Sequence, residues 1–256
     1  MNLGLEGKRF VVGGGSKGLG HAVAQVLVDE GARVLLVSRD ADALARAAAE
    51  LGERAEAHAA DLSDPAGIDS VVSRVTAEPG GLDGILVNHG GPPGGDALEL
   101  TDEQWAAAFQ LVVGGPIRLL RALVPHLNDG AAVLFITSVS VRQPIQGLDS
   151  SNVLRPGVAA LAKCLARELA PRVRVNTLAP GRFDTERVRW LDERRAEALG
   201  ITIEEQQAGA ASAIPLGRYG EPIELGRVAA FLLSPAASYV SGVSLQVDGG
   251  LVTAVP

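Results

Sequence analysis

The amino-acid sequence predicts a three-layer α/β fold in which a parallel, doubly wound sheet carries helices on both faces. Short apolar runs rich in β-branched residues alternate with longer helical patterns, an order typical of βαβ units. A glycine-rich turn, Gly13 to Gly20, lies between the first apolar run and the first helical pattern. In doubly wound sheets, ligands bind where such a turn meets the carboxyl edge of the strands.

The strands and several helix starts can be placed from local patterns. Asp64 followed by Pro65 fits a helix N-cap with proline in the first turn, and Thr101 with Gln104 fits a capping box. We interpret seven apolar runs as strands: Arg9 to Gly13, Arg33 to Val37, Ala55 to Ala59, Gly84 to Val87, Ala132 to Ile136, Val173 to Asn176 and Val243 to Val247.

The chain has 256 residues, of which 47% are hydrophobic, so it is long enough to bury the core of one large domain. It contains no internal repeat and no linker long enough to separate domains, and we therefore expect a single domain over residues 1–256. The stretch 184–215 breaks the alternation with polar helical turns. We expect it to be an insertion over the carboxyl edge of the sheet, where substrate lids lie.

Charge and hydropathy argue against two classes of partner. The formal net charge is -7 and there is no run of Lys or Arg, so counterion release would not favour nucleic acid. The first residues lack the apolar region of a signal peptide, and no apolar run is judged long enough to span a bilayer. We therefore expect a soluble, cytoplasmic protein that binds neither nucleic acid nor membranes.

Cys164 is the only cysteine, so the chain has no intrachain disulfide and no cysteine-based metal cluster. It follows Leu161 and precedes Leu165 in a helical pattern, which favours a small buried hydrophobe over a reactive thiol. No metal-ligand spacing is found at three of the histidines: His21, His58 and His126.

The glycine-rich turn has the composition of a phosphate-binding turn. Side chains at Gly14, Gly18 and Gly20 would block the backbone from approaching a pyrophosphate held at the N-terminus of the following helix. The alternative is a tight turn in which the glycines serve geometry alone. We favour the dinucleotide because the turn opens the first βαβ unit.

Four further segments follow this turn in a fixed order. They are Asp61-Leu62, Asn88-His89-Gly90-Gly91, Pro180-Gly181 with Thr185, and Val247-Asp248-Gly249-Gly250. With the spacing Gly14-x-x-x-Gly18-x-Gly20, they resemble the short-chain dehydrogenase/reductase family over essentially the whole chain. The resemblance implies a Rossmann-type fold with strand order 3-2-1-4-5-6-7, a homotetramer, and hydride transfer between a nicotinamide dinucleotide and a small carbonyl or alcohol substrate.

The same resemblance assigns roles to the segments after the strands. Asp61-Leu62 looks like the pair that contacts adenine, and Pro180-Gly181 with Thr185 looks like the segment that clasps the nicotinamide carboxamide. The full set of expected cofactor-binding residues is Gly14, Ser16, Lys17, Gly18, Leu19, Ser38, Arg39, Asp61, Leu62, Asn88, Gly90, Pro180, Gly181 and Thr185.

The end of the second strand favours NADP(H) over NAD(H). A site for NAD usually places an acidic residue there, whereas a 2'-phosphate calls for a cation. Arg39 after Ser38 offers a planar donor fork for phosphate, and Lys17 could add a second charge. If Asp40 faces the ribose instead, the preference reverses to NAD(H). For both cations the alternative is an ordinary solvated surface charge.

The family uses a serine, a Tyr-x-x-x-Lys pair and often an asparagine in catalysis, and most of these are replaced here. Ser138 fits the serine position. The tyrosine position falls on Ser151, the lysine position on Arg155 and the asparagine position on Val112. No other alignment restores the pair, because no lysine lies four residues after either tyrosine, Tyr219 or Tyr239.

These replacements limit the chemistry that the resemblance implies. A serine hydroxyl and an arginine guanidinium do not exchange protons near neutral pH. Ser151 and Arg155 would face one side of a helix, where Arg155 could bind the nicotinamide ribose or an anionic substrate. The alternative is a helix-surface arginine paired with a carboxylate. Pro156 suggests that the helix begins there, which would place Arg155 in a loop.

His89 follows a central strand and could donate a proton if its pKa lies near neutrality. We favour the alternative, a loop histidine hydrogen-bonded to backbone groups. The charged residues of 184–215 have mixed signs at helical spacing, which favours a solvated face over a clamp for an anionic substrate.

Two functions fit these observations. The first is an NADP(H)-dependent oxidoreductase in which Ser138 polarises the substrate oxygen, Ser151 and Arg155 orient the substrate, and the proton comes from water or His89. The second is a dinucleotide-binding scaffold or sensor that has lost dehydrogenase activity. We favour the enzyme because Ser138 and the lid segment are retained.

Overall fold

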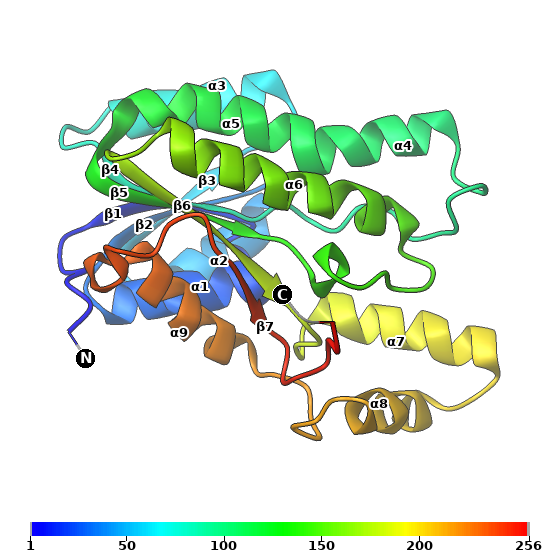
Figure 1. Cartoon of the computed structure of the whole chain (residues 1–256). Coiled ribbons are helices and arrows are strands. Elements are labelled where there is room, and N and C mark those ends of the chain that lie inside the picture. The colour runs from blue at the N-terminus through cyan, green and yellow to red at the C-terminus, as the bar shows by residue number, and fades with distance from the viewer. Residues whose placement is uncertain (1, 255–256) are drawn as a thin grey trace.

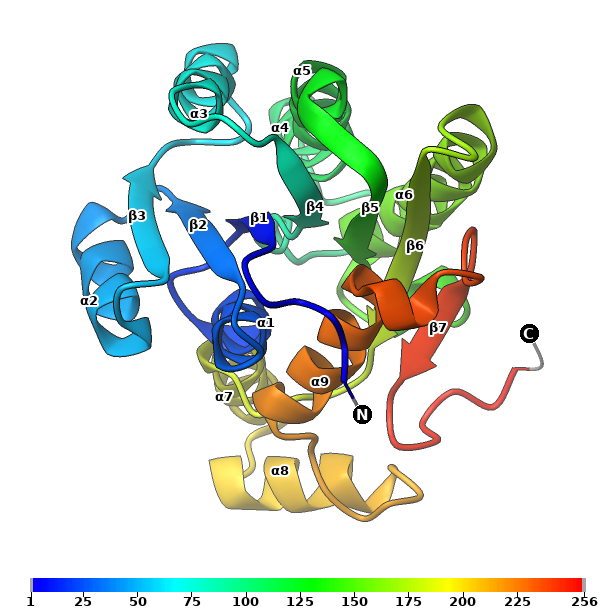
Figure 2. The same ribbon diagram turned by 90° about the vertical axis from the view of Figure 1, so that its left-hand side faces the viewer.

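The computed structural model describes residues 2–254 as a seven-stranded parallel sheet between two layers of helices (Figures 1 and 2). The strand order is β3-β2-β1-β4-β5-β6-β7, which confirms the predicted fold class, and each of the seven predicted strands is present. Their bounds are β1 Arg9–Gly13, β2 Arg33–Ser38, β3 Ala55–Ala59, β4 Leu82–Val87, β5 Leu127–Ile136, β6 Val173–Pro180 and β7 Ser244–Val247.

The helices lie between successive strands, and three of them follow one another between β6 and β7. They are α1 Gly18–Asp29, α2 Ala41–Leu51, α3 Pro65–Thr76, α4 Asp102–Phe109, α5 Gly115–Leu123, α6 Asp149–Glu168, α7 Glu186–Leu199, α8 Ile203–Ser212 and α9 Pro222–Leu233. Two predicted starts are confirmed, because the Asp64 carboxylate caps α3 and Thr101 forms a capping box with Gln104 at α4.

Strand alternation divides the core between the two faces of the sheet. Phe10 and Val12 of β1 pack with α1, α2 and α9, whereas Val11 between them packs toward α3, α5 and α6. Figure 2 shows these two helix groups on opposite sides of the fanned sheet. Side chains alternate across a strand, so a strand buried on both faces needs a continuous apolar run, as Phe10 to Val12 provides.

The structure corrects two expectations about α6. The helix begins at Asp149 and contains Pro156 in its interior, so Arg155 is helical and does not lie in a loop. Proline removes one hydrogen bond from a helix, and packing against the sheet can outweigh this loss. Cys164 is exposed on this helix, because Ala162 and Ala166 occupy the buried positions instead.

One helical stretch, Asp102–His126, passes a length and hydropathy test for crossing a membrane, with a mean hydropathy of 1.4. The expectation that no apolar run is long enough was wrong on this measure. The stretch combines α4, α5 and short turns, and Leu119, Leu120 and Leu123 are buried against the sheet. Core helices pass the same test, so the finding is weak evidence for a membrane span.

Gly226 lets α9 lie directly on α1, the helix that follows the glycine-rich turn. A Cβ atom at this position would lie 2.5 Å from the carbonyl oxygen of Ala22. Real side chains do not approach backbone so closely, and α9 would have to move away. The close packing at Gly226 therefore holds the N-terminal half of α1 against α9.

We expect Gly226→Ala to lower the free energy of unfolding by about 1–3 kcal/mol, because overpacking shifts the two helices apart. Urea denaturation measures the change. Gly209→Ala in α8 is the matched control, since a Cβ there meets nothing within 4 Å, and it should be neutral or slightly stabilising. An unchanged stability for Gly226→Ala would contradict the proposed close packing.

Candidate functional site

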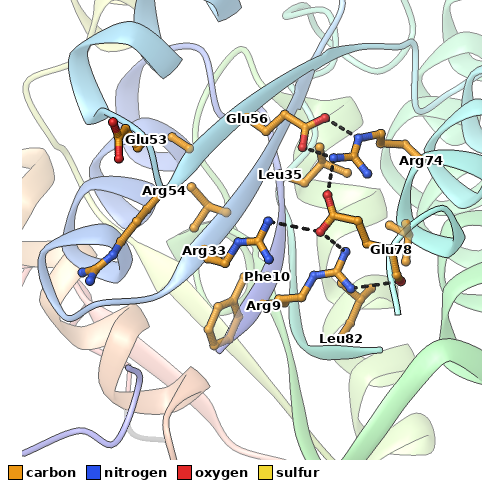
Figure 3. Close-up of a pocket in the computed structure, with 13 residues that line it drawn as sticks. Arg9, Phe10, Arg33, Leu35, Glu53, Arg54, Glu56, Arg74, Glu78 and Leu82 are labelled. Atoms are coloured by element: carbon orange, nitrogen blue, oxygen red, sulfur yellow. Dashed lines mark hydrogen bonds and ion pairs between the residues drawn. The ribbon is translucent and has the colours of Figure 1, made fainter. Parts of the chain in front are cut away.

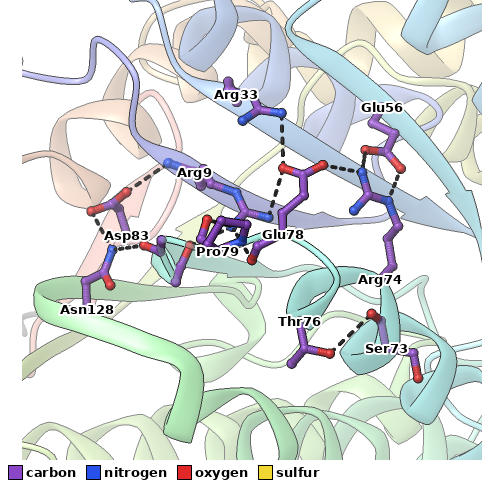
Figure 4. A network of polar contacts seen from close by, with 12 residues as sticks. Arg9, Arg33, Glu56, Ser73, Arg74, Thr76, Glu78, Pro79, Asp83 and Asn128 are labelled. Carbon is purple, nitrogen blue, oxygen red and sulfur yellow. Dashed lines mark hydrogen bonds and ion pairs between the residues drawn. The ribbon is translucent and has the colours of Figure 1, made fainter.

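The two edges of the sheet differ in chemistry. At the amino edge, a hollow is lined by the starts of β1, β2 and β3, but most of its charged residues pair with one another (Figure 3). Arg74 binds Glu56 and Glu78, and Glu78 also binds Arg33 (Figure 4). The hydrogen bonds from Arg74 hold the pKa of Glu78 below its ordinary value. Because these arginines and glutamates already bind one another, we place the candidate site at the carboxyl edge.

The glycine-rich turn at the carboxyl edge has the backbone that the sequence predicts. Gly14 and Gly18 adopt positive φ of 62° and 60°, a conformation in which side chains are strained. A Cβ at Gly20 would lie 2.2 Å from the carbonyl oxygen of Gly14. Asn88 after β4 donates from Nδ2 to the carbonyl oxygen of Gly13 at 3.2 Å, which joins the two strand ends. The turn therefore keeps its backbone bare and close to α1.

The first turn of α1 presents backbone amides without a side-chain cap. Lys17 is the N-cap residue, its backbone is extended, and no side-chain cap hydrogen bond forms. Uncapped amides at a helix N-terminus are donors for an anion. Ser16 precedes Lys17, and Leu19 lies in the first turn of α1; cofactor binding by these two residues stays a prediction. The ammonium of Lys17 forms an ion pair with Glu186 at the start of α7.

The end of β2 is arranged to accept a polar group. The Ser38 hydroxyl is buried and has no hydrogen-bond partner in residues 2–254. Arg39 is exposed beside it. The carboxylate of Asp40 accepts from the amide of Ala43 at 3.0 Å and caps α2. Asp40 is therefore engaged in capping, which leaves Ser38 and Arg39 to face a ligand.

Asp61 and Leu62 follow β3, where Asp61 binds Ser63 and Leu62 packs in the core. The Asp61 carboxylate accepts from the Ser63 hydroxyl at 2.6 Å and from its amide at 2.8 Å. These hydrogen bonds lower the pKa of Asp61. The Leu62 side chain is buried in the core. Adenine contact by this pair remains a prediction.

His89 is neither a histidine with a pKa near neutrality nor, within residues 2–254, one hydrogen-bonded to backbone groups. Its Nε2 atom is buried without a hydrogen-bond partner among the described residues, so backbone groups do not satisfy the ring as expected. Burial, with a further effect of Arg155, lowers the pKa of His89 to about 4. The ring is therefore neutral at pH 7, and the suggested pKa near neutrality was wrong. Gly90 beside it faces open space.

Ser138 and Ser151 are linked through Ser140 near the carboxyl end of β5. Ser138 is partly buried, and its Oγ accepts from the amide of Ser140 at 3.1 Å. The Ser140 hydroxyl lies 3.4 Å from that of Ser151, and both residues are buried. The structure thus brings Ser138 and Ser151 to the same end of the sheet. Ser140 is a member of this group that the sequence did not single out.

Arg155 is bound to the end of β5. Its Nη1 donates to the carbonyl oxygens of Ile136 and Thr137, both at 2.9 Å. No carboxylate pairs with it within residues 2–254, which overturns the alternative of a surface ion pair. Burial, with a further effect of Arg187, lowers the pKa of Arg155 to about 10. The guanidinium remains charged at neutral pH.

The end of β6 leads into α7 over the glycine-rich turn. Gly181 donates its amide to the carbonyl oxygen of Val247 at 2.9 Å after Pro180, which holds this end beside β7. Thr185 caps α7, and its methyl group faces Gly18, where a Cβ would meet it at 3.7 Å. The predicted residues at both ends of the site are therefore close in space.

Asp192 holds α7 in place and was not predicted. Its carboxylate is fully buried, forms an ion pair with Arg182, and accepts from the Tyr219 hydroxyl at 2.9 Å. Burial raises the pKa of Tyr219, which argues against this tyrosine as a proton donor. Charges of both signs alternate in 184–215, and no spacing in that stretch marks Asp192 as buried.

Val112, which the sequence predicts at the asparagine position, lies inside a short π-helix, Gln110–Gly114, between α4 and α5. Such segments occur often at functional sites. The Val112 side chain is buried and offers no hydrogen bond. The local backbone feature is therefore present without a polar side chain at this residue.

Comparison with known proteins gives consistent matches over nearly the whole chain. A family model described as enoyl-(acyl carrier protein) reductase matches residues 14–252. The 3-oxoacyl-[acyl-carrier-protein] reductase FabG of Vibrio cholerae is 31% identical over 253 residues, covering 97% of this chain and 99% of the relative.

Two solved structures are similar in fold and in sequence. L-sorbose reductase from Gluconobacter frateurii, complexed with NADPH and L-sorbose, has a TM-score of 0.94 and 32% identity and covers 100% of both chains. An NADPH-bound short chain oxidoreductase from Pseudomonas aeruginosa PAO1, described as containing an atypical catalytic center, has a TM-score of 0.87 and 31% identity, covering 97% of this chain and 98% of that chain.

We expect the stability to fall as the pH drops from 6.5 toward 4, in part because His89 takes up a proton only on unfolding. Its folded pKa of about 4 lies below the ordinary value of 6.5, so the unfolded chain binds more protons in this window. His89→Gln should reduce the loss between pH 7 and 4.5 by about 2 kcal/mol in urea denaturation. His126→Gln is the control, and equal losses in wild type and His89→Gln would refute the assignment.

Proposed function

The chain belongs to the short-chain dehydrogenase/reductase family, and from this premise we propose that it is an NADP(H)-dependent oxidoreductase with a proton donor other than tyrosine. Its substrate is a small carbonyl compound or the corresponding alcohol. The observation that carries the proposal is the bare glycine-rich turn beside an uncapped α1, with Ser138 at the end of β5 across the same edge.

The residues of the carboxyl edge fit a dinucleotide. The amides of the turn at Gly14 to Leu19 would hold the diphosphate, and the buried, unpartnered Ser38 hydroxyl with Arg39 would hold the 2'-phosphate. Asp40 is used as a helix cap, which favours NADP(H). Bound NADPH supplies the hydride for the carbonyl carbon. The two similar structures that contain NADPH support this choice.

Ser138 would polarise the substrate oxygen. Its hydroxyl accepts from the Ser140 amide, so its own hydrogen is available to donate to a carbonyl. The Ser151 hydroxyl contacts the hydroxyl of Ser140, whose amide donates to Ser138. Arg155 is fixed to the strand end next to Ser138. Ser151 and Arg155 would orient the substrate and take no part in proton transfer.

Water is the proposed source of the proton. His89 is neutral at pH 7, and the Tyr219 hydroxyl donates its hydrogen to the buried Asp192 carboxylate, so neither side chain offers a proton to the substrate. An alkoxide formed beside Arg155 and Ser138 would be stabilised until a water molecule protonates it. The Pseudomonas relative with an atypical catalytic center supports a departure from the usual donor.

The segment 184–215 is proposed as a substrate lid of a single-domain protein. The ion pair of Lys17 with Glu186 joins the first turn of α7 to the glycine-rich turn. The ion pair of Asp192 with Arg182 holds the middle of α7. A cytoplasmic homotetramer is proposed from family membership.

A carbonyl and alcohol panel followed by NADPH absorbance tests the proposal. We expect turnover of at least one carbonyl compound, together with binding of NADPH measured by calorimetry. Binding without any turnover would contradict the enzyme and favour the alternative of a dinucleotide-binding scaffold or sensor. Failure to bind either NADPH or NADH would refute both functions.

Arg39→Ala should weaken NADPH binding about tenfold to a hundredfold and change NADH binding little, because a charge-assisted hydrogen bond to the 2'-phosphate is lost. Calorimetric titration of both cofactors measures this. Arg46→Ala, another exposed arginine on the adjacent α2, is the matched control. Equal losses for NADPH and NADH would show that Arg39 does not select the cofactor.

Ser138→Ala should lower kcat about 10²-fold with the NADPH dissociation constant unchanged, because the hydroxyl acts on charge that develops at the substrate oxygen. Steady-state kinetics on the best substrate of the panel, with cofactor calorimetry, separates the two effects. Ser73→Ala on α3 is the control. A full rate in Ser138→Ala would remove this residue from the mechanism.

A further inference from the structure

Two arginines near Ser138 carry positive charge that no acidic side chain balances. In and beside the lid segment, Arg189 is paired with Asp184 and Arg182 with Asp192. Two more lid arginines lack an acidic partner in the part of the chain that the structure describes but lie away from the glycines after β4: Arg194 stacks on Trp190, and Arg195 donates to the Gln146 side chain.

Arg155 and Arg187 have no acidic partner in residues 2–254, and their polar contacts are to carbonyl oxygens. Arg155 is partly removed from water, and a charge in that position is costly unless an opposite charge compensates it.

Arg155 offers an unused side of its guanidinium group. Nη1 is held by the carbonyl oxygens of Ile136 and Thr137. Nε and Nη2 make no hydrogen bond within the described chain, and neither is a fully buried unpartnered atom. These atoms remain for a ligand, and the Thr137 carbonyl that anchors Nη1 belongs to the residue directly before Ser138.

Arg187 reaches the same end of the sheet from α7. Its Nη2 donates to the carbonyl oxygen of Pro92 at 3.1 Å, and the guanidinium lies against Gly91, where a Cβ would be 3.0 Å from Nη2. Trp190 holds the other face, with the Arg187 Cζ 5.1 Å from the ring centroid. The side chain is thus positioned although the residue is exposed.

Neighbouring residues of one segment connect the two arginines. Arg187 donates to the carbonyl oxygen of Pro92. The Ser150 hydroxyl, on the same helix α6 as Arg155, donates to the carbonyl oxygen of Pro93. Repulsion by the charge of Arg187 contributes to the lowered pKa of Arg155.

The nearby acids are engaged elsewhere, Asp61 with Ser63 and Glu186 with Lys17. An anion between the arginines would remove the repulsion, and a planar carboxylate matches the donor fork of a guanidinium.

We infer that Arg155 and Arg187 bind a carboxylate group of the carbonyl substrate, so that the substrate is a small oxo acid. This inference rests on the proposed function and names its substrate class. Arg155 is fixed beside Ser138, which places the carboxylate near the reacting carbonyl. Reduction adds a hydride to the carbonyl carbon and a proton from water to its oxygen, which gives a hydroxy acid.

The cofactor does not supply this anion. Its diphosphate is assigned to the turn after β1, and β4 lies between β1 and β5 in the sheet. The 2'-phosphate is assigned to Ser38 and Arg39 after β2, one strand further away. A ribose is neutral and would not balance two positive charges.

Calorimetry with oxamate tests the binding without requiring turnover. Oxamate has a carboxylate beside an amide that hydride does not reduce, and methyl oxamate is its neutral counterpart. With NADP⁺ present, we expect oxamate to bind at least tenfold more tightly than methyl oxamate. Arg187→Gln should abolish this difference, and Arg189→Gln on the same helix, normally paired with Asp184, should retain it.

Kinetics on matched substrates gives the second measurement. Pyruvate and acetoacetate are compared with their methyl esters, and Arg187→Gln should raise KM for the acids at least tenfold while kcat changes less. Equal use of acids and esters, or an unchanged Arg187→Gln variant, would overturn the inference and leave the proposed function standing. Tighter binding of inorganic phosphate than of oxamate would overturn the carboxylate assignment.

The two proposals can fail separately. If oxamate binds through Arg187 but no carbonyl compound is reduced, the anion site is supported and the proposed reduction is refuted. If esters alone are reduced, the reduction is supported and the anion site is refuted.

Discussion

Parallel pairing of the central strands is the constraint on which the site depends. The register pairs Val12 with Leu86, Val87 with Phe135 and Ile136 with Leu178, so β1, β4, β5 and β6 end along one edge. Each strand end then delivers one part of the site from a distant part of the sequence. Apolar side chains on both faces of the sheet hold this register, because a slip of one residue would exchange the two cores.

The hydrogen bonds of Arg155 show how a helix cation can be tied to a strand. The carbonyl oxygens of Ile136 and Thr137 accept from one nitrogen, and backbone carbonyl dipoles partly offset the cost of burial. A guanidinium has five donors in a fixed plane, so it can be anchored on one side and still bind on the other. Arginine at this position therefore combines support of the strand end with a charge directed toward the site.

The sequence predicted the parts of the molecule that depend on local patterns. Apolar alternation located the strands, and Asp64 and Thr101 marked helix starts that the structure confirms. It could not predict contacts between distant segments. The buried Asp192 is held by Arg182 and Tyr219, which belong to loops on either side of the lid. Pro156 favoured a helix that begins there, but α6 begins at Asp149 because packing outweighs this local preference.

The ion pair of Lys17 with Glu186 joins the cofactor turn to the first turn of α7. A diphosphate held at that turn would compete with the Glu186 carboxylate for the same ammonium group. Binding of the dinucleotide would therefore weaken the ion pair that holds the start of α7, the helix that carries Arg187. The free energy of the two binding events would be coupled through this lysine, and by linkage each ligand would alter the affinity for the other by the same factor.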